Sequence, residues 1–206
     1  KKKADEMAKQ REVFVKGAQE RHGIAKSKAL EVFEVMEKFA QYGFNRSHSA
    51  AYSVLAYQTA YLKAHYPAAY MASVLTHNQS DIDKITFFMD ECKRQGIQVL
   101  GPDVNESEAT FGVNQEQQIR FGLSAIKGVG EAAVEEIILE RKRAEPFQDV
   151  FSLAERVNLK AVSKKTFENL AMAGAFDSFS NYHRRQYLWA DNGDGSLIEK
   201  AIRYGQ

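Results

Sequence analysis

Apolar residues recur every three or four positions over most of the first 95 residues, which is the spacing of an amphipathic helix. Ser27 has the character of an N-cap for a helix that ends at Gly43. We expect one face of this helix to be buried, consisting of Leu30, Phe33, Met36 and Phe39. The other helices expected here span residues 4–21, 49–65, 67–76 and 81–95, with Ser80 and Asp83 as a capping box for the last.

The segment 49–65 differs from its neighbours because it is nearly uncharged and apolar on most sides. Such a helix is normally buried on most sides. Its tyrosines Tyr57 and Tyr61 lie one turn apart, and we expect them in a core rather than on a surface that stacks bases. The apolar stretch from Ala50 to Leu62 is too short to span a bilayer.

The period changes after residue 96. A short strand is expected over 97–100 and a hairpin over 109–122, followed by a return to helical spacing. Helices are expected over 131–143, 149–157 and 163–172, after Asp177, and after the loop 191–196. The pattern predicts a mainly α fold in four parts: a helical region 1–96, a small β element 97–123, a second helical region 124–190 and an unassigned tail 191–206.

Composition excludes few function classes. The 206 residues are 44% hydrophobic and carry a formal net charge of +1, which gives no general attraction to nucleic acid. Charge is uneven, with nine Lys/Arg against four Asp/Glu in residues 1–28 and six against two in residues 156–185. A basic run is a solvated face as often as a polyanion contact.

The single cysteine, Cys92, excludes an internal disulfide and lies on an apolar helical stripe, so we expect it in the core of a cytoplasmic protein. No Cys/His cluster has zinc spacing, and no signal peptide is recognisable. The chain begins at Lys1 within a helical pattern and without a methionine, which suggests a piece of a larger protein.

The most informative motif is Lys127-Gly128-Val129-Gly130, at the start of the expected helix 131–143. Glycines at a helix start allow a tight turn and leave backbone N–H groups open to an anion, and Lys127 adds a positive charge. We therefore expect this turn to bind phosphate, with nucleic-acid backbone as the preferred ligand.

Two alternatives remain for this motif. The spacing Gly128-x-Gly130-x-x-Ala133 also fits a dinucleotide-binding turn, with Asp149 as its ribose-binding acid. That alternative needs a buried parallel strand before the turn and another strand after the helix, whereas Asp149 has the character of an N-cap. The turn could also be a helix connector. A similar hinge follows at Met172–Asp177, which by itself is better interpreted as a connector with a glycine C-cap.

The loop Tyr42–His48 is the second candidate site. Asn45, Arg46, Ser47 and His48 stand at the start of the helix 49–65, where backbone donors, a guanidinium and an imidazole could hold a phosphate chain. The alternative is that Asn45 or Ser47 is only an N-cap and His48 is packed.

Several motifs in matching order resemble one family, the bacterial DNA polymerase III alpha subunits, which are C-family replicative polymerases. The resemblance covers about residues 1–190, and no motif after Trp189 matches. It is carried by Phe39–Tyr52, Ala56–Lys63 with Tyr66-Pro67, Asp103–Ser107, Ile119–Gly122 with Ala125–Gly130, and Gly174–Asp177.

The resemblance implies specific roles. Residues 1–96 would be the later part of the fingers, with Asn45, Arg46, Ser47 and His48 toward the incoming deoxynucleoside triphosphate. Residues 124–190 would be a tandem helix-hairpin-helix region, in which Lys127, Gly128, Val129 and Gly130 meet phosphates of duplex primer-template DNA. Position 46 could also be lysine in this family; arginine keeps the charge and changes the geometry.

The resemblance also implies what lies elsewhere. The family's catalytic aspartates and their Mg²⁺ ions belong to a palm domain upstream, so we expect no catalytic residue, metal or cofactor in this chain and no polymerase activity by the chain alone. The expected partners of the full protein are other subunits of the DNA polymerase III holoenzyme in the bacterial cytoplasm, and no membrane. The rival functions are a stand-alone helical DNA-binding module and a nucleotide-cofactor enzyme.

Overall fold

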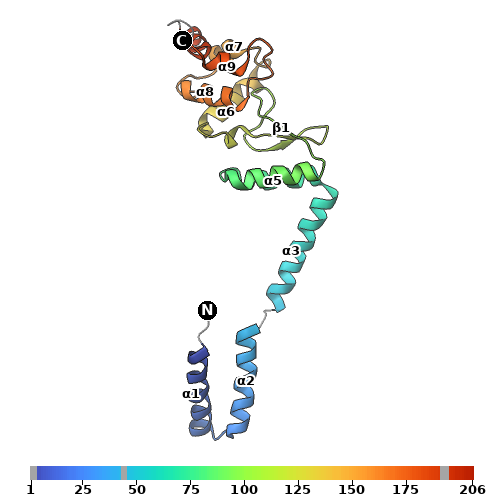
Figure 1. Ribbon diagram of the computed structural model, residues 1–206, viewed down its shortest axis with the longest axis vertical. Coiled ribbons are helices and arrows are strands. Elements are labelled where there is room, and N and C mark those ends of the chain that lie inside the picture. The colour runs from blue at the N-terminus through green and yellow to red at the C-terminus, as the bar shows by residue number, and fades with distance from the viewer. Residues whose placement is uncertain (1–3, 43–45, 191–194) are drawn as a thin grey trace. The chain divides into compact units, whose positions relative to one another are not determined.

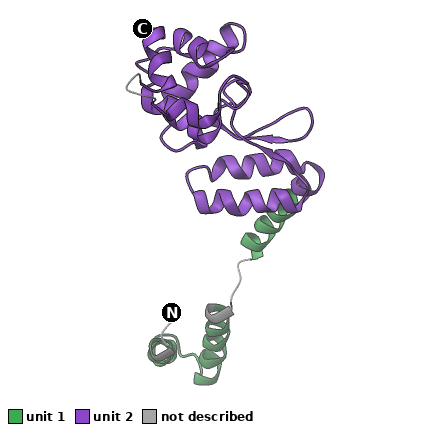
Figure 2. Ribbon diagram, turned by 45° about the horizontal axis from the view of Figure 1, so that its top comes forward, with its two compact units in different colours: residues 1–59 green, residues 60–206 purple. Residues whose placement is uncertain are grey.

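The structure is a computed structural model that describes residues 4–42, 46–190 and 195–206. It confirms a mainly α fold and divides the chain into two compact units, residues 1–59 and 60–206 (Figure 2). Within the described residues the elements follow the chain as in Figure 1: α1 Ala4–His22, α2 Lys26–Tyr42, α3 Arg46–His65, α4 Pro67–His77, α5 Ile82–Arg94, β1 Val99–Leu100, β2 Gly112–Val113, β3 Ile119–Arg120, the 3-10 turn η1 Leu123–Ala125, α6 Glu131–Arg143, α7 Val150–Arg156, α8 Lys164–Ala173, α9 Arg184–Leu188 and α10 Leu197–Gly205.

The first unit contains a hairpin of α1 and α2, which pack against each other around Val15, Ala29 and Phe33. The expected buried stripe of α2 is wrong in part. Phe33 is buried and Leu30 is half-buried, but Met36 and Phe39 are 49% and 67% exposed. A single partner helix covers only a narrow strip of α2, so the rest of the apolar face stays in solvent. Ser27 is also not the N-cap, because α2 begins at Lys26.

The helix α3 corrects a second expectation. It runs from Arg46 to His65 as a helix, yet none of its residues is buried, and Tyr57 and Tyr61 are 70% and 45% exposed rather than in a core. An apolar helix is buried only where other elements pack around it. The sequence pattern records that need, whereas no described part of this chain meets it.

The second unit begins with α4, α5 and a three-stranded sheet that share one small core. Strand β3 pairs antiparallel with β2 and parallel with β1, so the expected hairpin is confirmed and the strand near residues 97–100 joins it. Cys92 is fully buried in this core, as expected. The cap of α5 is Asp81 rather than Ser80, because its carboxylate accepts a hydrogen bond from the N–H of Lys84. The other buried residues here are Ala68, Met71, Ala72, Leu75, Ile85, Phe111 and Ile119.

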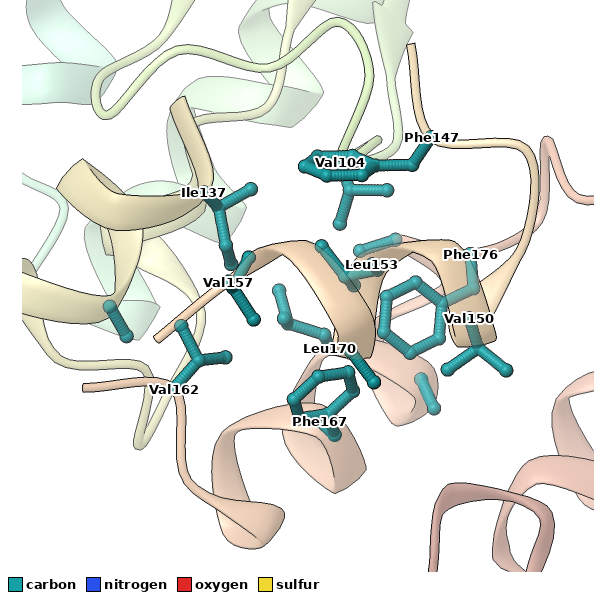
Figure 3. Close-up of a cluster of buried hydrophobic side chains, with 14 of the residues drawn as sticks. Val104, Ile137, Phe147, Val150, Leu153, Val157, Val162, Phe167, Leu170 and Phe176 are labelled. Atoms are coloured by element: carbon teal, nitrogen blue, oxygen red, sulfur yellow. The ribbon is translucent and has the colours of Figure 1, made fainter. Parts of the chain in front are cut away.

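A larger core lies among the helices α6–α10 (Figure 3). Its centre is formed by Ile137 of α6, Leu153 of α7, Phe167 and Leu170 of α8, and Phe176 after α8. The helices expected over 131–143, 149–157 and 163–172 are confirmed within two residues. The helix expected after Asp177 begins only at Arg184, because residues 175–179 run as a tight turn that buries Ala175, Phe176 and Phe179.

The loop Asp103–Ser107 joins the sheet to the helical core. The Asn105 side chain forms two hydrogen bonds with the backbone of Phe147: its Nδ2 donates to the carbonyl oxygen at 2.8 Å, and its Oδ1 accepts from the N–H at 2.8 Å. Ser107 Oγ donates to the carbonyl oxygen of Phe121, next to β3. Val104 is fully buried against the core, and its N–H donates to the carbonyl oxygen of Ala175.

We predict that Asn105→Ala lowers the free energy of unfolding of the second unit by about 2–3 kcal/mol, because it leaves a backbone donor and a backbone acceptor of buried Phe147 unpaired. Urea unfolding followed by fluorescence of the chain's one tryptophan, Trp189, measures this. The exposed Asn181 provides a control, since Asn181→Ala should stay within about 0.5 kcal/mol of the wild type. Equal stability of the two variants would show that the Asn105 contacts do not hold the loop.

Candidate functional site

The segment Ile126–Gly130 forms an exposed hairpin between η1 and α6. Two apolar side chains anchor it, because Ile126 and Val129 are only 7% and 8% exposed and belong to the helical core. The N–H of Val129 donates to the carbonyl oxygen of Ile126 at 3.1 Å and closes the turn. Lys127, Gly128 and Gly130 are exposed. The hairpin therefore turns its apolar residues inward and presents backbone and one lysine outward.

Gly128 is required by the fold itself. Its φ is +79°, a left-handed conformation that residues with a Cβ adopt at a cost of roughly 1–2 kcal/mol. A Cβ at this position would also collide with the side-chain amide of Asn169. That amide donates from Nδ2 to the carbonyl oxygen of Gly128 at 3.1 Å and so fixes the hairpin against α8.

Gly130 is different, because nothing in the fold requires a glycine there. Its φ and ψ of −79° and 154° are ordinary for any residue, and a Cβ would meet no atom within 4 Å. Gly130 is the N-cap of α6, and no side chain among the described residues caps this helix start. By contrast, side-chain oxygens cap the starts of other helices; they belong to Asp81, Asp149, Ser163 and Ser196. The open amides of α6 thus face an accessible surface with room for a ligand.

A hollow of about 590 Å³ lies between the hairpin and α8. Lys127 of the hairpin and Lys165 of α8 both line it, and both are exposed. Neither lysine forms an ion pair with any residue in the described ranges 4–42, 46–190 and 195–206. Its apolar lining comes from Pro102, Phe121, Ile126 and Met172. The hollow therefore combines two uncommitted positive charges with the open start of α6.

Most other cations of the basic run 156–185 are committed within the fold. Arg156 donates to the carbonyl oxygens of Glu140 and Glu145 and covers the ring of Phe147. Lys164 lies 2.6 Å from a carboxylate oxygen of Glu199, whose charge raises the pKa of Lys164. These two cations serve the packing of the helices.

Arg184 and Arg185 of α9 are also engaged. The guanidinium of Arg184 binds Asp177, and this hydrogen bonding raises the pKa of Arg184. Arg185 lies over the ring of Trp189, 4.6 Å from its centroid. The sequence-level charge of residues 156–185 thus overstates what an external anion could meet.

The second predicted site is only partly described. Asn45 lies outside the described residues. Arg46, Ser47 and His48 form the exposed first turn of α3, and the ring of His48 lies 4.3 Å from that of Tyr52, measured between centroids. These three residues belong to the first unit and the hairpin to the second, so the structure describes two separate candidate sites.

The dinucleotide alternative fails on the elements that flank the turn. The helix α6 leads into α7, and no further strand follows it in the described residues. Asp149 is committed as the N-cap of α7, since its Oδ1 accepts from the N–H of Ser152 at 2.8 Å. The proposed ribose-binding acid is therefore a helix cap.

Two further observations concern metals and membranes. The described residues contain no group of three or more His, Cys, Asp or Glu side chains placed to hold a metal ion. No helix in the described ranges has the length and hydropathy needed to cross a membrane.

Comparison with known proteins matches both regions. The family model of the helix-hairpin-helix motif matches residues 96–187, which include the hairpin and its hollow. The DNA polymerase III subunit alpha of Haemophilus influenzae is 49% identical over 177 residues, 86% of this chain and 15% of that protein. The Escherichia coli K12 subunit is 48% identical over the same share. That of Vibrio cholerae is 47% identical over 208 residues, 100% of this chain and 18% of that protein.

The chain spans only 15–18% of the length of these relatives. Identity of nearly one half nevertheless extends over both compact units, since the Vibrio cholerae match covers the whole chain. The chain belongs to the family of the DNA polymerase III alpha subunits, as a segment that carries their helix-hairpin-helix motif.

Proposed function

We propose that this chain is a DNA-contacting segment of a replicative DNA polymerase, and that the hairpin Ile126–Gly130 binds the phosphate backbone of duplex primer-template DNA. The observation that supports this most directly is Gly130. The fold leaves open space at this glycine and an uncapped helix start beside it, as expected where a ligand approaches the backbone closely.

The ligand atoms that fit this hairpin are phosphate oxygens rather than base edges. Backbone N–H groups and the ammonium of Lys127 are donors that suit phosphate and carry little sequence information. The exposed carboxylate of Glu131, in the first turn of α6, is the opposing charge at this position. Contact of this kind holds a duplex in register without selecting its sequence, which is what a replicative polymerase needs of a site away from its chemistry.

The first turn of α3 is the proposed nucleotide-facing site. Arg46 places a guanidinium at a helix N-terminus, where the positive end of the helix dipole also favours anions. Asn45, Ser47 and His48 would complete a surface for the triphosphate of the incoming deoxynucleotide. In the longer full-length protein, other segments would cover the apolar sides of α3 that are exposed here and hold this turn in place.

The nucleotidyl transfer itself belongs to residues outside this chain. Two-metal chemistry needs clustered carboxylates to hold Mg²⁺, and the described residues provide no such cluster. The proposed role of this chain is therefore to position the nucleotide and the duplex, and it should not extend a primer alone. A stand-alone DNA-binding module is the weaker rival, because the similarity to the polymerase subunits extends over α1, α2 and α3 as well.

We predict that Lys127→Ala flattens the dependence of log affinity on log salt by about one unit, as expected for one lost phosphate contact. Gly130→Val should weaken binding more, because a β-branched side chain blocks the approach of the backbone. Gly130→Ser should also weaken binding while preserving the helix start, since serine is a favoured N-cap. The measurement is binding of the chain to two duplexes of unrelated sequence across a salt series.

The matched control for these variants is Gly101→Ser. Gly101 is also exposed, and a Cβ there also meets no atom within 4 Å, but it lies away from the hairpin motif. It should bind like the wild type. A strong preference for one duplex sequence, or a salt slope that none of the hairpin variants changes, would reduce the hairpin to a connector.

We predict that Arg46→Ala in the full-length polymerase lowers kcat/KM for the nucleotide roughly 10²-fold, the scale for loss of one preorganised charged donor. Primer-template affinity should change little, and Arg46→Lys should retain more activity than Arg46→Ala because it keeps the charge. Single-nucleotide incorporation kinetics measure this, with Arg21→Ala as the control for an exposed arginine of the same unit. An unchanged kcat/KM in Arg46→Ala would identify the turn as a structural helix start.

A further inference from the structure

The chain contains two turns with the same backbone geometry, and they can be compared residue by residue. Gly128 and Gly174 are both left-handed, with φ of +79° and +87°. Aligned on these glycines, Lys127 corresponds to Ala173, and Gly130 corresponds to Phe176. The second turn therefore lacks both the cation and the open glycine of the first.

The second turn is also closed by its own side chains. Phe176 is 1% exposed and packs against Phe179 and Tyr187, with ring centroids 5.7 and 5.3 Å apart. Gly174 is buried, and a Cβ there would collide with the guanidinium of Arg184. That guanidinium is held over the turn by Asp177, whose Oδ1 accepts from Arg184 Nε at 2.8 Å.

The amides of the second turn are occupied as well. The N–H of Gly174 donates to the carbonyl oxygens of Leu170 and Ala171, and the N–H of Ala175 donates to that of Leu170. These bonds form the C-terminal cap of α8. A phosphate at this turn would have to displace Arg184 and would find few donors behind it.

The helix that leads into the second turn offers a different contact. Lys165, in the first turn of α8, lines the same hollow as Lys127 and Gly128. Its neighbour Lys164 is committed to Glu199 and Glu168, whereas Lys165 forms no ion pair in the part of the chain that the structure describes. Asn169, one turn further along α8, holds the carbonyl of Gly128, so the two cations have a fixed structural link.

We infer that the duplex backbone is bound by the first hairpin together with Lys165, and that the second turn does not contact DNA but serves as the joint between α8 and α9. This inference rests on the proposed function and adds a residue that is outside both hairpin motifs. Lys127 and Lys165 would each neutralise a phosphate on either side of the hollow, whose apolar lining suits the deoxyribose carbons between them.

The test of Lys165 is the salt dependence of duplex binding by the chain. Lys165→Ala should flatten the log–log slope by about one unit, and Lys127→Ala/Lys165→Ala by about two. The matched control is Lys160→Ala, which removes an exposed lysine of the same basic run that lies outside the hollow. It should leave the slope within a few tenths of the wild type.

The test of the second turn is the double variant Asp177→Asn/Arg184→Gln, which removes the ion pair without changing the net charge. Its slope should equal that of the wild type, with thermal unfolding recorded to separate any loss of stability. A flattening of about one unit would mean that Arg184 contacts phosphate and would overturn the inference, as would an unchanged slope in Lys165→Ala.

These results are distinguishable from failure of the proposed function. If the chain does not bind duplex DNA, or if neither Lys127→Ala nor the Gly130 variants change binding, the hairpin itself is not the site and the inference about Lys165 falls with it. If Lys127→Ala flattens the slope and Lys165→Ala does not, the proposed function stands and only the inference is wrong.

Discussion

The arrangement of the second unit depends on the hydrogen bonds of one short loop, Asp103–Ser107. A sheet of two-residue strands has too little ladder bonding to hold its own position. The loop compensates by attaching the sheet to the helices through backbone atoms of Phe121, Phe147 and Ala175. Arg141 of α6 adds a second attachment, because its Nη1 donates to the carbonyl oxygens of Val104 and Ser107. The turn that leads into α6 therefore starts from a fixed base.

That fixed base explains how a hairpin made largely of glycine can be a defined binding surface. The residues that determine its shape, Ile126 and Val129, are buried, and Asn169 holds the peptide between Gly128 and Val129. Backbone amides that are held in place lose little conformational entropy when a ligand binds. Recognition by backbone also suits a ligand that repeats along its length, since every phosphate of a duplex offers the same oxygens.

Charge in this protein is distributed by commitment rather than by number. A net charge of +1 and two basic runs suggest only a diffuse attraction to polyanions. In the folded second unit, Arg156, Lys164 and Arg184 neutralise partners or cap carbonyls, and Lys127 and Lys165 remain beside one hollow. The Arg184–Asp177 pair has the further effect of closing the turn at Gly174. Two turns of the same backbone shape thus have opposite characters, one open to a ligand and one sealed.

The sequence by itself determined the local features of this chain. Helix starts at Pro67, Asp149 and Ser163, the left-handed glycines, the hairpin around 114–117 and the mainly α class all follow from short-range backbone chemistry, which neighbouring residues carry. The Lys127–Gly130 motif was recognisable for the same reason. Only the tertiary structure decided which apolar faces are covered, so the burial expected for α3, Met36 and Phe39 was wrong. It also decided which cations stay available, and it placed Lys165 beside Lys127, because contacts between residues nearly forty positions apart leave no periodic signal in the chain.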